Sequence, residues 1–324
     1  MQHFRTEGFD TMGKILPRVA DLSLMLLQVY AVLTILATLG FLLAGMDMFD
    51  AVNHALTTVA TGGFSTRDAS LGDFGPATHY VAALFMWLAG LPFIRYVQLV
   101  NGDVRPLWHD VQVRAYARWT LYAVAAIMAY RVVAGEAPGE EMLRLTLMNT
   151  ISLTTGTGYG AGDVAAWGDV PLLILIVMGF IGACTASTGC SIKVFRFLVL
   201  FGAIGAQLRQ LVHPNRVTLI QIDGRRVEDE VIASVIVMFI AFMLGFGMLM
   251  ILLSLTGLEA RTAITAAWTA IANIGPAFGP EVGPTGSVDG FSDAAKALMI
   301  VGMLLGRLEM VAVLVLLLPR FWRG

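Results

Sequence analysis

Long apolar runs recur along the chain and are separated by shorter polar stretches. The hydrocarbon core of a bilayer, roughly 30 Å thick, is crossed by about 20 helical residues. The clearest runs of about that length are Leu22–Ala44, Tyr80–Val100, Val231–Leu255 and Ala294–Leu318. Two less uniform runs are Trp119–Val133 and Pro171–Phe201. The pattern predicts an all-α membrane protein that crosses the bilayer several times.

A shorter pattern recurs between these runs: a brief segment of helical character, followed by a stretch rich in glycine and threonine. The brief segments, too short to cross a bilayer, are Asp50–Val59, Glu140–Leu153 and Ala260–Ala272. The stretches that follow them are Ala60–Thr66, Thr154–Gly160 and Asn273–Gly279. Such recurrence indicates one duplicated module. It predicts repeated helix–pore-loop–helix units around a central ion pore.

The chemistry of a cation explains the glycines. A ring of backbone carbonyls can replace the hydration shell of potassium, and glycine adopts the necessary backbone conformations most easily. Non-helical backbone at membrane depth is tolerated only where it is buried or lines a water-filled cavity. The C-terminal end of a short helix also directs partial negative charge toward the ion. We expect Gly62, Gly158 and Gly275 to occupy corresponding places in the three loops.

These loops supply the candidate ion-binding residues of a selectivity filter. The candidates are Ala60, Thr61, Gly62, Gly63, Thr157, Gly158, Tyr159, Asn273, Ile274, Gly275 and Pro276. Potassium itself is expected at Thr61, Gly62, Thr157, Gly158, Ile274 and Gly275. The alternative is that the glycines belong to external loops or to helix packing. Three copies behind three short helices favour the filter.

The run Pro171–Phe201 is too long, and too polar in its middle, for one ordinary span. Its interrupting residues are Gly179, Gly182, Thr185, Ser187, Thr188 and Gly189. One interpretation is a continuous helix with small packing residues. The other is a helix unwound at membrane depth, because interrupted helices can mark transport paths. We favour the second, with a gate loop below the filter.

Two arginines lie within apolar runs. Arg307 is central in Ala294–Leu318, where a charge costs at least a few kcal/mol and must face protein or water. A structural ion pair with Glu309 is an alternative, although residues two apart on a helix point to different faces. Arg95 is near a helix end, and we interpret it as a snorkelling anchor.

Charge placement predicts the orientation in the membrane. Lysine and arginine cluster before residue 19, in 95–118, in 193–226 and after residue 319. The positive-inside rule places these clusters and both termini in the cytoplasm, so the helices occur in three pairs. The chain is 57% hydrophobic and 14% charged, unlike a soluble domain. Its net charge of −2 implies no bulk affinity for nucleic acid.

The predicted organisation has five parts. They are a cytoplasmic segment at 1–18, a first repeat at 19–110, a second repeat with a broken second helix at 111–210, a cytoplasmic connection at 211–230 and a third repeat at 231–324. Asp223-Gly224 signals a hairpin in the connection, which we expect to be a docking surface for a cytoplasmic partner. No constellation of catalytic side chains lies at membrane depth, so an enzyme is not expected.

Six segments, in order along nearly the whole chain, carry a family resemblance. They are Thr58–Ser70 (TVATGGFSTRDAS), Ser152–Asp163 (SLTTGTGYGAGD), Gly182–Arg196 (GACTASTGCSIKVFR), Leu211–Asn215 (LVHPN), Asn273–Pro284 (NIGPAFGPEVGP) and Met303–Glu309 (MLLGRLE). The chain resembles the Trk/Ktr/HKT superfamily of potassium transporters, and most closely the TrkH type. One departure is that the stretch around Cys184 and Cys190 is less glycine-rich than the family usually shows.

The resemblance implies a potassium uptake subunit of the bacterial inner membrane that conducts potassium passively and is gated, with no cofactor beyond the transported ion. Transport of sodium, or sodium-coupled secondary transport of potassium, is the alternative. It implies a homodimer in membrane lipid with one pore per subunit, and a cytoplasmic nucleotide-binding regulator of the TrkA type. It places Arg307 in the cavity beneath the filter, where the side chain repels cations and contacts the gate loop.

The resemblance also bears on the number of repeats. Family members have four helix–loop–helix repeats around one pore, whereas three are found in this sequence. These three look like the second to fourth repeats, with the first missing. Because four loops close such a filter, residues 1–324 by themselves are expected not to conduct.

Overall fold

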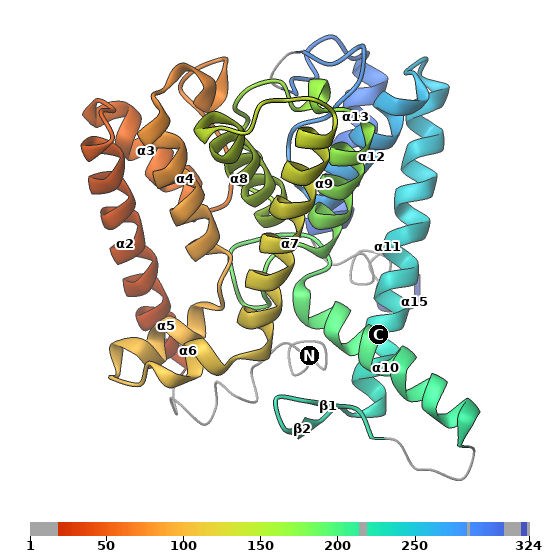
Figure 1. The fold of residues 1–324 in the computed structure, drawn as a ribbon. Coiled ribbons are helices and arrows are strands. Elements are labelled where there is room, and N and C mark those ends of the chain that lie inside the picture. Colours follow the sequence, from red (N-terminus) through yellow and green to blue (C-terminus); the bar gives the residue numbers. More distant parts are fainter. Residues whose placement is uncertain (1–18, 214–218, 284–285, 308–318, 323–324) are drawn as a thin grey trace.

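The computed structural model describes residues 19–213, 219–283, 286–307 and 319–322. Helices dominate it, and the described part contains one small two-stranded sheet. The predicted all-α class is therefore confirmed. The predicted segment 1–18, Glu309 and residues 308–318 of the last apolar run lie outside the described residues. Figure 1 shows long helices standing side by side, with short helices and loops between them.

The first helix–loop–helix unit starts with a long helix and returns through a bent one. Its elements are α2 (Val19–Leu43), α3 (Met48–Val59), the 3-10 turn η2 (Ser70–Asp73), α4 (Pro76–Ala89) and α5 (Phe93–Val100). The Asp47 carboxylate accepts a 2.7 Å hydrogen bond from the Asp50 N–H and so caps the start of α3. The short helix begins two residues before its predicted start.

The run Tyr80–Val100, predicted as one span, is bent by 89° between α4 and α5. This correction has a local cause. Pro92 has no N–H to continue the helical hydrogen bonds, and Gly90 lies so close to Tyr116 that an added Cβ would be 2.7 Å from the Tyr116 hydroxyl. After the bend, the Phe93 N–H donates to the Ala186 carbonyl at 2.9 Å. The bend therefore joins this unit to the loop of the next one.

The second unit contains the predicted broken helix. Its elements are α6 (Arg105–His109), α7 (Val111–Val133), α8 (Glu140–Thr155), the 3-10 turn η3 (Val164–Trp167), α9 (Asp169–Ile181) and α10 (Val194–Val212). The chain is non-helical between Ile181 and Val194, so the predicted interruption of Pro171–Phe201 is confirmed. That loop crosses the middle of the molecule (Figure 1).

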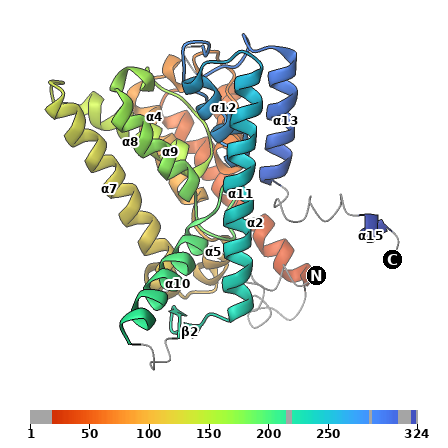
Figure 2. The same ribbon diagram turned by 90° about the vertical axis from the view of Figure 1, so that its right-hand side faces the viewer.

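The third unit follows a hairpin. Its elements are β1 (Gln221–Ile222), β2 (Arg225–Arg226), α11 (Asp229–Leu255), α12 (Ala260–Ala272), α13 (Asp293–Arg307) and α15 (Pro319–Trp322). The hairpin signal at Asp223-Gly224 is confirmed, because both residues have positive φ and the strands pair antiparallel. Figure 2 shows α11 and α13 standing next to each other, with α7 inclined on the far side.

Three helices in the described ranges are long and apolar enough to cross a membrane: Ser23–Leu43 within α2, then α10 and α11. The bent pair of α4 and α5 makes a fourth if it is taken as one span. Helix α9 is apolar but shorter, at 13 residues. The order of a long helix, a short helix, a loop and a second helix occurs three times along the chain.

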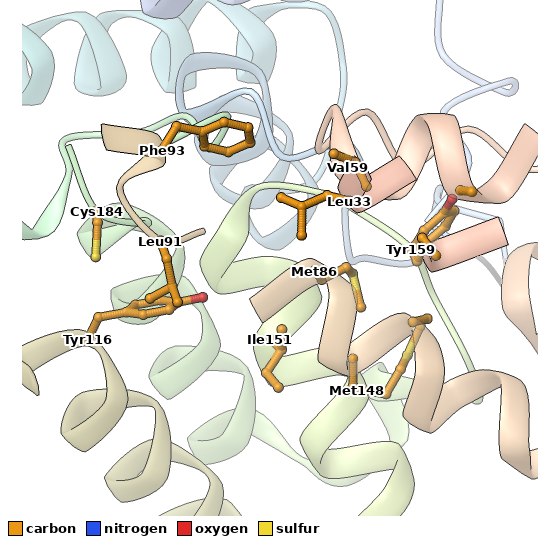
Figure 3. Close-up of a cluster of buried hydrophobic side chains, with 14 of the residues drawn as sticks. Leu33, Val59, Met86, Leu91, Phe93, Tyr116, Met148, Ile151, Tyr159 and Cys184 are labelled. Carbon is orange, nitrogen blue, oxygen red and sulfur yellow. The ribbon is translucent and has the colours of Figure 1, made fainter. Parts of the chain in front are cut away.

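The short helices lie inside the molecule. Every residue of α8 from Met148 to Thr155 is buried, as is every residue of α12 from Thr265 to Ala272. The largest hydrophobic cluster packs α2, α3 and α4 against α7 and α8. Figure 3 shows part of it, including Leu33, Val59, Met86 and Tyr159. This packing holds the ends of the short helices, and hence the loops after them, in fixed positions.

Candidate ion pathway

The three short helices end in the same way. In each, the N–H five residues after a hydroxyl-bearing residue donates back to the carbonyl of that residue. The pairs are Gly62 to Thr57 at 2.7 Å, Thr157 to Ser152 at 3.0 Å and Ile274 to Thr269 at 3.0 Å. These bonds give the three loops a common register, which can be counted residue by residue.

The next residue in each loop also turns back. Gly63 N–H donates to the Thr57 carbonyl at 3.3 Å, and Gly158 N–H donates to the Ser152 carbonyl at 3.4 Å. In the third loop, Gly275 N–H donates instead to the Thr269 hydroxyl at 2.7 Å. Gly63, Gly158 and Gly275 are therefore equivalent.

This register corrects one prediction. Gly62 does not correspond to Gly158 and Gly275; it corresponds to Thr157 and Ile274. By the same count, the counterpart of Thr157 with Gly158 is Gly62 with Gly63, and not Thr61 with Gly62. The reason is conformational, because Thr61 has a left-handed φ of 52°, as Gly156 (72°) and Asn273 (54°) have in the other loops.

All three equivalent glycines need their backbone conformation, and Gly63 and Gly158 also need their small size. Their φ angles are 65° at Gly63, 89° at Gly158 and 120° at Gly275, which residues with a Cβ rarely adopt. A Cβ on Gly63 would lie 1.9 Å from the Thr157 carbonyl oxygen, and one on Gly158 would lie 2.0 Å from the Ile274 carbonyl oxygen. The three loops therefore meet, backbone against backbone, at these glycines.

The other filter candidates have different surroundings. Ala60 ends α3 as its exposed C-cap residue, and Asn273 ends α12, with its side-chain amide donating to the Met303 carbonyl at 3.1 Å. Tyr159 and Pro276 are buried. The Tyr159 carbonyl accepts a 2.7 Å hydrogen bond from the Ser152 hydroxyl. These four residues therefore support the loops from the side of the helices. The backbone at Gly63, Gly158 and Gly275, by contrast, is where one loop contacts the next.

Sequence reasoning missed the hydroxyl residues behind the loops. Thr57 donates to the Phe64 carbonyl at 2.9 Å, Ser152 donates to Tyr159 as described, and Thr269 accepts from Gly275. Each lies six residues before its equivalent glycine. A serine or threonine at that fixed spacing, in all three copies, is the signal that would have found them.

The loop between α9 and α10 lies against the ends of the short helices. The Thr61 hydroxyl donates to the Thr188 carbonyl at 2.9 Å, and a Cβ on Gly189 would lie 2.9 Å from the Thr155 carbonyl oxygen. The Thr188 hydroxyl in turn donates to the Ala89 carbonyl at 3.2 Å. Residues 182–193, called the gate loop below, are thus in contact with the first two filter loops.

Most gate candidates lie in this loop. Gly182 has φ 74°, and the Thr185 N–H donates to the Gln112 side chain at 3.1 Å. The Ser187 hydroxyl donates to the Cys184 carbonyl at 2.6 Å. Gly179 differs, because it lies inside α9, where a Cβ would be 2.4 Å from the Trp268 ring. We assign Gly179 to helix packing.

Arg307, the last described residue of α13, also contacts the gate loop. Its guanidinium Nη1 donates to the thiol sulfur of Cys190, at the end of the described part of α13. The preceding Gly306 packs on α12, since a Cβ there would be 1.9 Å from the Ile271 carbonyl oxygen. Arg307 thus contacts the gate loop at Cys190, which is one part of what the family resemblance implies.

Arg95 is not a free anchor at a helix end. Its Nε donates to an Asp110 carboxylate oxygen at 2.6 Å, and its Nη1 donates to Gln98 at 3.0 Å. The side chains of Arg95 and Asp110 are only 17% and 6% exposed. The interpretation as a snorkelling residue is therefore wrong; Arg95 forms a nearly buried ion pair across the connection from α5 to α7.

The ion pair yields a stability prediction. Arg95→Met leaves the Asp110 carboxylate buried without its partner, which we expect to destabilise the protein by about 3 kcal/mol. The double variant Arg95→Met/Asp110→Asn removes both charges and should recover part of that loss. Thermal unfolding in detergent micelles measures both. A double variant less stable than Arg95→Met would contradict this account of the pair.

A cavity of about 280 Å³ lies between the second and third loops. Its lining includes Asn149, Tyr159, Asp163, Pro276 and Val282. The Asp163 carboxylate is already used to cap η3, accepting from the Ala165 N–H at 2.9 Å. The cavity leaves open space next to the place where the second and third loops meet.

Comparison with known proteins gives one consistent result. A family model described as TrkH, cation transport protein, matches residues 6–323. The Trk system potassium uptake protein TrkI of Halomonas elongata is 38% identical over 325 residues, which cover 100% of this chain and 66% of that protein. TrkH of Vibrio parahaemolyticus is 34% identical over 332 residues, covering 100% of this chain and 68% of that protein.

A solved structure is similar over the same extent. The crystal structure of the potassium transporter TrkH from Vibrio parahaemolyticus superposes with a TM-score of 0.87 at 32% identity. The match covers 96% of this chain and 67% of that one. The chain thus spans about two thirds of the length of the relatives it matches.

Proposed function

Because the chain belongs to the TrkH family of cation transport proteins, which are multi-pass membrane transporters and not enzymes, we propose that it forms a selective pathway for potassium uptake. The observation that carries the proposal is the common register of the three loops. It brings Gly63, Gly158 and Gly275, in left-handed conformations, to the place where the loops meet.

In this pathway, backbone carbonyls of the loops replace the water that potassium sheds. Gly62 with Gly63, Thr157 with Gly158 and Ile274 with Gly275 supply them. The three short helices end at these loops, so their C-terminal partial charges favour a cation there. The buried faces of α8 and α12 keep the loops from moving toward or away from the ion.

Conduction in this proposal is passive and gated. The gate loop contacts the first two filter loops, and Arg307 adds a positive charge at Cys190. A cation at this place repels a potassium ion that leaves the filter. Movement of the gate loop together with Arg307 would then open the path.

We also propose that the protein works in an assembly. The relatives carry the name of a Trk system, which suggests more than one component. We place a cytoplasmic nucleotide-binding regulator of the TrkA type at the end that carries α10 and the β1–β2 hairpin. On this proposal the protein is a homodimer in the bacterial inner membrane, with both termini on the regulator's side.

Uptake into cells tests the proposal. The complete gene product containing residues 1–324 is expressed in cells that lack their own potassium uptake systems, with empty vector as control. We expect growth at low external potassium and uptake of radioactive rubidium. Normal expression in the membrane without either result would contradict potassium transport.

Purified protein in liposomes separates passive conduction from sodium coupling. We expect a potassium gradient alone to drive uptake, at the same rate when choline replaces sodium. Uptake that requires a sodium gradient would favour the sodium-coupled alternative.

A further inference from the structure

Tyr159 connects the second filter loop to the short helix of the preceding unit. The residue is buried, with 1% of its surface exposed. Its hydroxyl lies 2.6 Å from the Thr57 hydroxyl, accepts from Thr58 at 3.3 Å and can donate to the His54 carbonyl at 3.1 Å. All three partners are on α3. Figure 3 places Tyr159 in the buried cluster together with Val59 at the end of that helix.

The backbone of Tyr159 is bonded to a different helix, α8. Its carbonyl accepts the 2.7 Å hydrogen bond from Ser152 on α8, so this oxygen is directed to the helix behind the loop. A carbonyl so engaged is poorly placed to coordinate an ion in the pathway. Tyr159 therefore contributes by its position between α3 and α8 and not by ion binding.

One hydroxyl network serves two loops. The Thr57 hydroxyl can accept from Tyr159 of the second loop while it donates to the Phe64 carbonyl of the first loop at 2.9 Å. Each hydroxyl has one donor hydrogen, and this arrangement satisfies both. The Tyr159 ring also packs beside the His54 ring, with 5.9 Å between ring centroids. The first two filter loops are thus fastened to a single point on α3.

We propose that Tyr159 is a positioning residue for potassium selectivity: its hydroxyl, hydrogen-bonded to Thr57 of α3, prevents the second loop from closing onto a smaller cation. This inference rests on the proposed potassium pathway. Sodium would need carbonyls closer together than potassium does. Gly158, the neighbour of Tyr159, is where the second loop meets the third, so a small inward shift of Tyr159 would change the width of the path there.

The test uses Tyr159→Phe in the complete gene product, with bi-ionic reversal potentials in liposomes as the readout. The variant keeps the buried ring and loses only the hydroxyl. We expect potassium conduction to persist and the preference for potassium over sodium to fall about five- to tenfold, the factor that one lost hydrogen bond represents. Tyr80→Phe is the matched control. Its hydroxyl donates to Glu140 at 3.0 Å, away from the filter loops, so its selectivity should not change.

A second pair of variants, at Thr57, keeps the test decisive if Tyr159→Phe fails to fold. Thr57→Val removes the partner hydroxyl, while Thr57→Ser keeps it, so loss of selectivity in the first and its retention in the second would support the proposal. Wild-type selectivity in both Tyr159→Phe and Thr57→Val would overturn it and leave potassium conduction standing. Absence of potassium conduction in the unmodified protein would instead contradict the proposed function.

Discussion

Gly63→Ser is expected to lower the preference for potassium about tenfold or more, whereas Gly62→Ser, at the adjacent residue, should leave most of it intact. Gly63 has φ 65°, and a Cβ there would be 1.9 Å from the Thr157 carbonyl oxygen, so the second loop must move. Strained backbone of this kind costs about 1–3 kcal/mol, enough to lower the potassium preference about tenfold or more.

Gly62 provides a control one residue away. Its φ is not in the left-handed region, and the nearest atoms to an added Cβ, at 3.3 Å, belong to the Phe64 ring. Phe64 is 76% exposed, so this ring can move aside. Reversal potentials for potassium against sodium compare the two variants. If Gly62→Ser were the more damaging change, the register of the first loop would be wrong.

The second large effect is expected at the gate. Arg307→Ala removes a positive charge from the gate loop and releases Cys190. A unit charge about 4 Å from a cation in water costs about 1 kcal/mol. Its removal should raise basal potassium flux about fivefold and reduce dependence on a regulatory partner. Rubidium uptake at matched expression measures the change.

Lys296 on the same helix supplies the control for charge. Its ammonium donates to the Asp289 carbonyl at 2.8 Å, three turns before Arg307. Lys296→Ala should therefore leave basal flux unchanged. An equal increase in both variants would mean that the loss of any positive charge on α13 suffices, and flux unchanged in Arg307→Ala would make that residue structural.

The periodic features of this fold could be predicted from sequence. The short helix α12 has the predicted bounds, Ala260–Ala272, because an apolar amphipathic stretch ends there at an asparagine with positive φ. The interruption between α9 and α10 could also be predicted, since small and polar residues in an apolar run rarely continue a transmembrane helix. Local composition decides both features.

Features that depend on distant partners could not be predicted. Thr61 adopts a left-handed φ and is held by the Thr188 carbonyl, 127 residues away, so counting glycines misplaced the register of the first loop. The Tyr159 hydroxyl is hydrogen-bonded to the Thr57 hydroxyl, 102 residues away. Arg95 pairs with Asp110 at the start of α7, beyond the end of the apolar run that contains Arg95. In each case a tertiary contact overrides the local pattern.

The most direct test of the potassium pathway is to locate the ion. Crystals of the complete gene product grown with thallium in place of potassium would show the bound cation by anomalous scattering. We expect density where the three loops meet, next to the carbonyls of Gly62, Thr157 and Ile274 and the glycines that follow them. Ordered thallium elsewhere in the protein, with none between these loops, would contradict it.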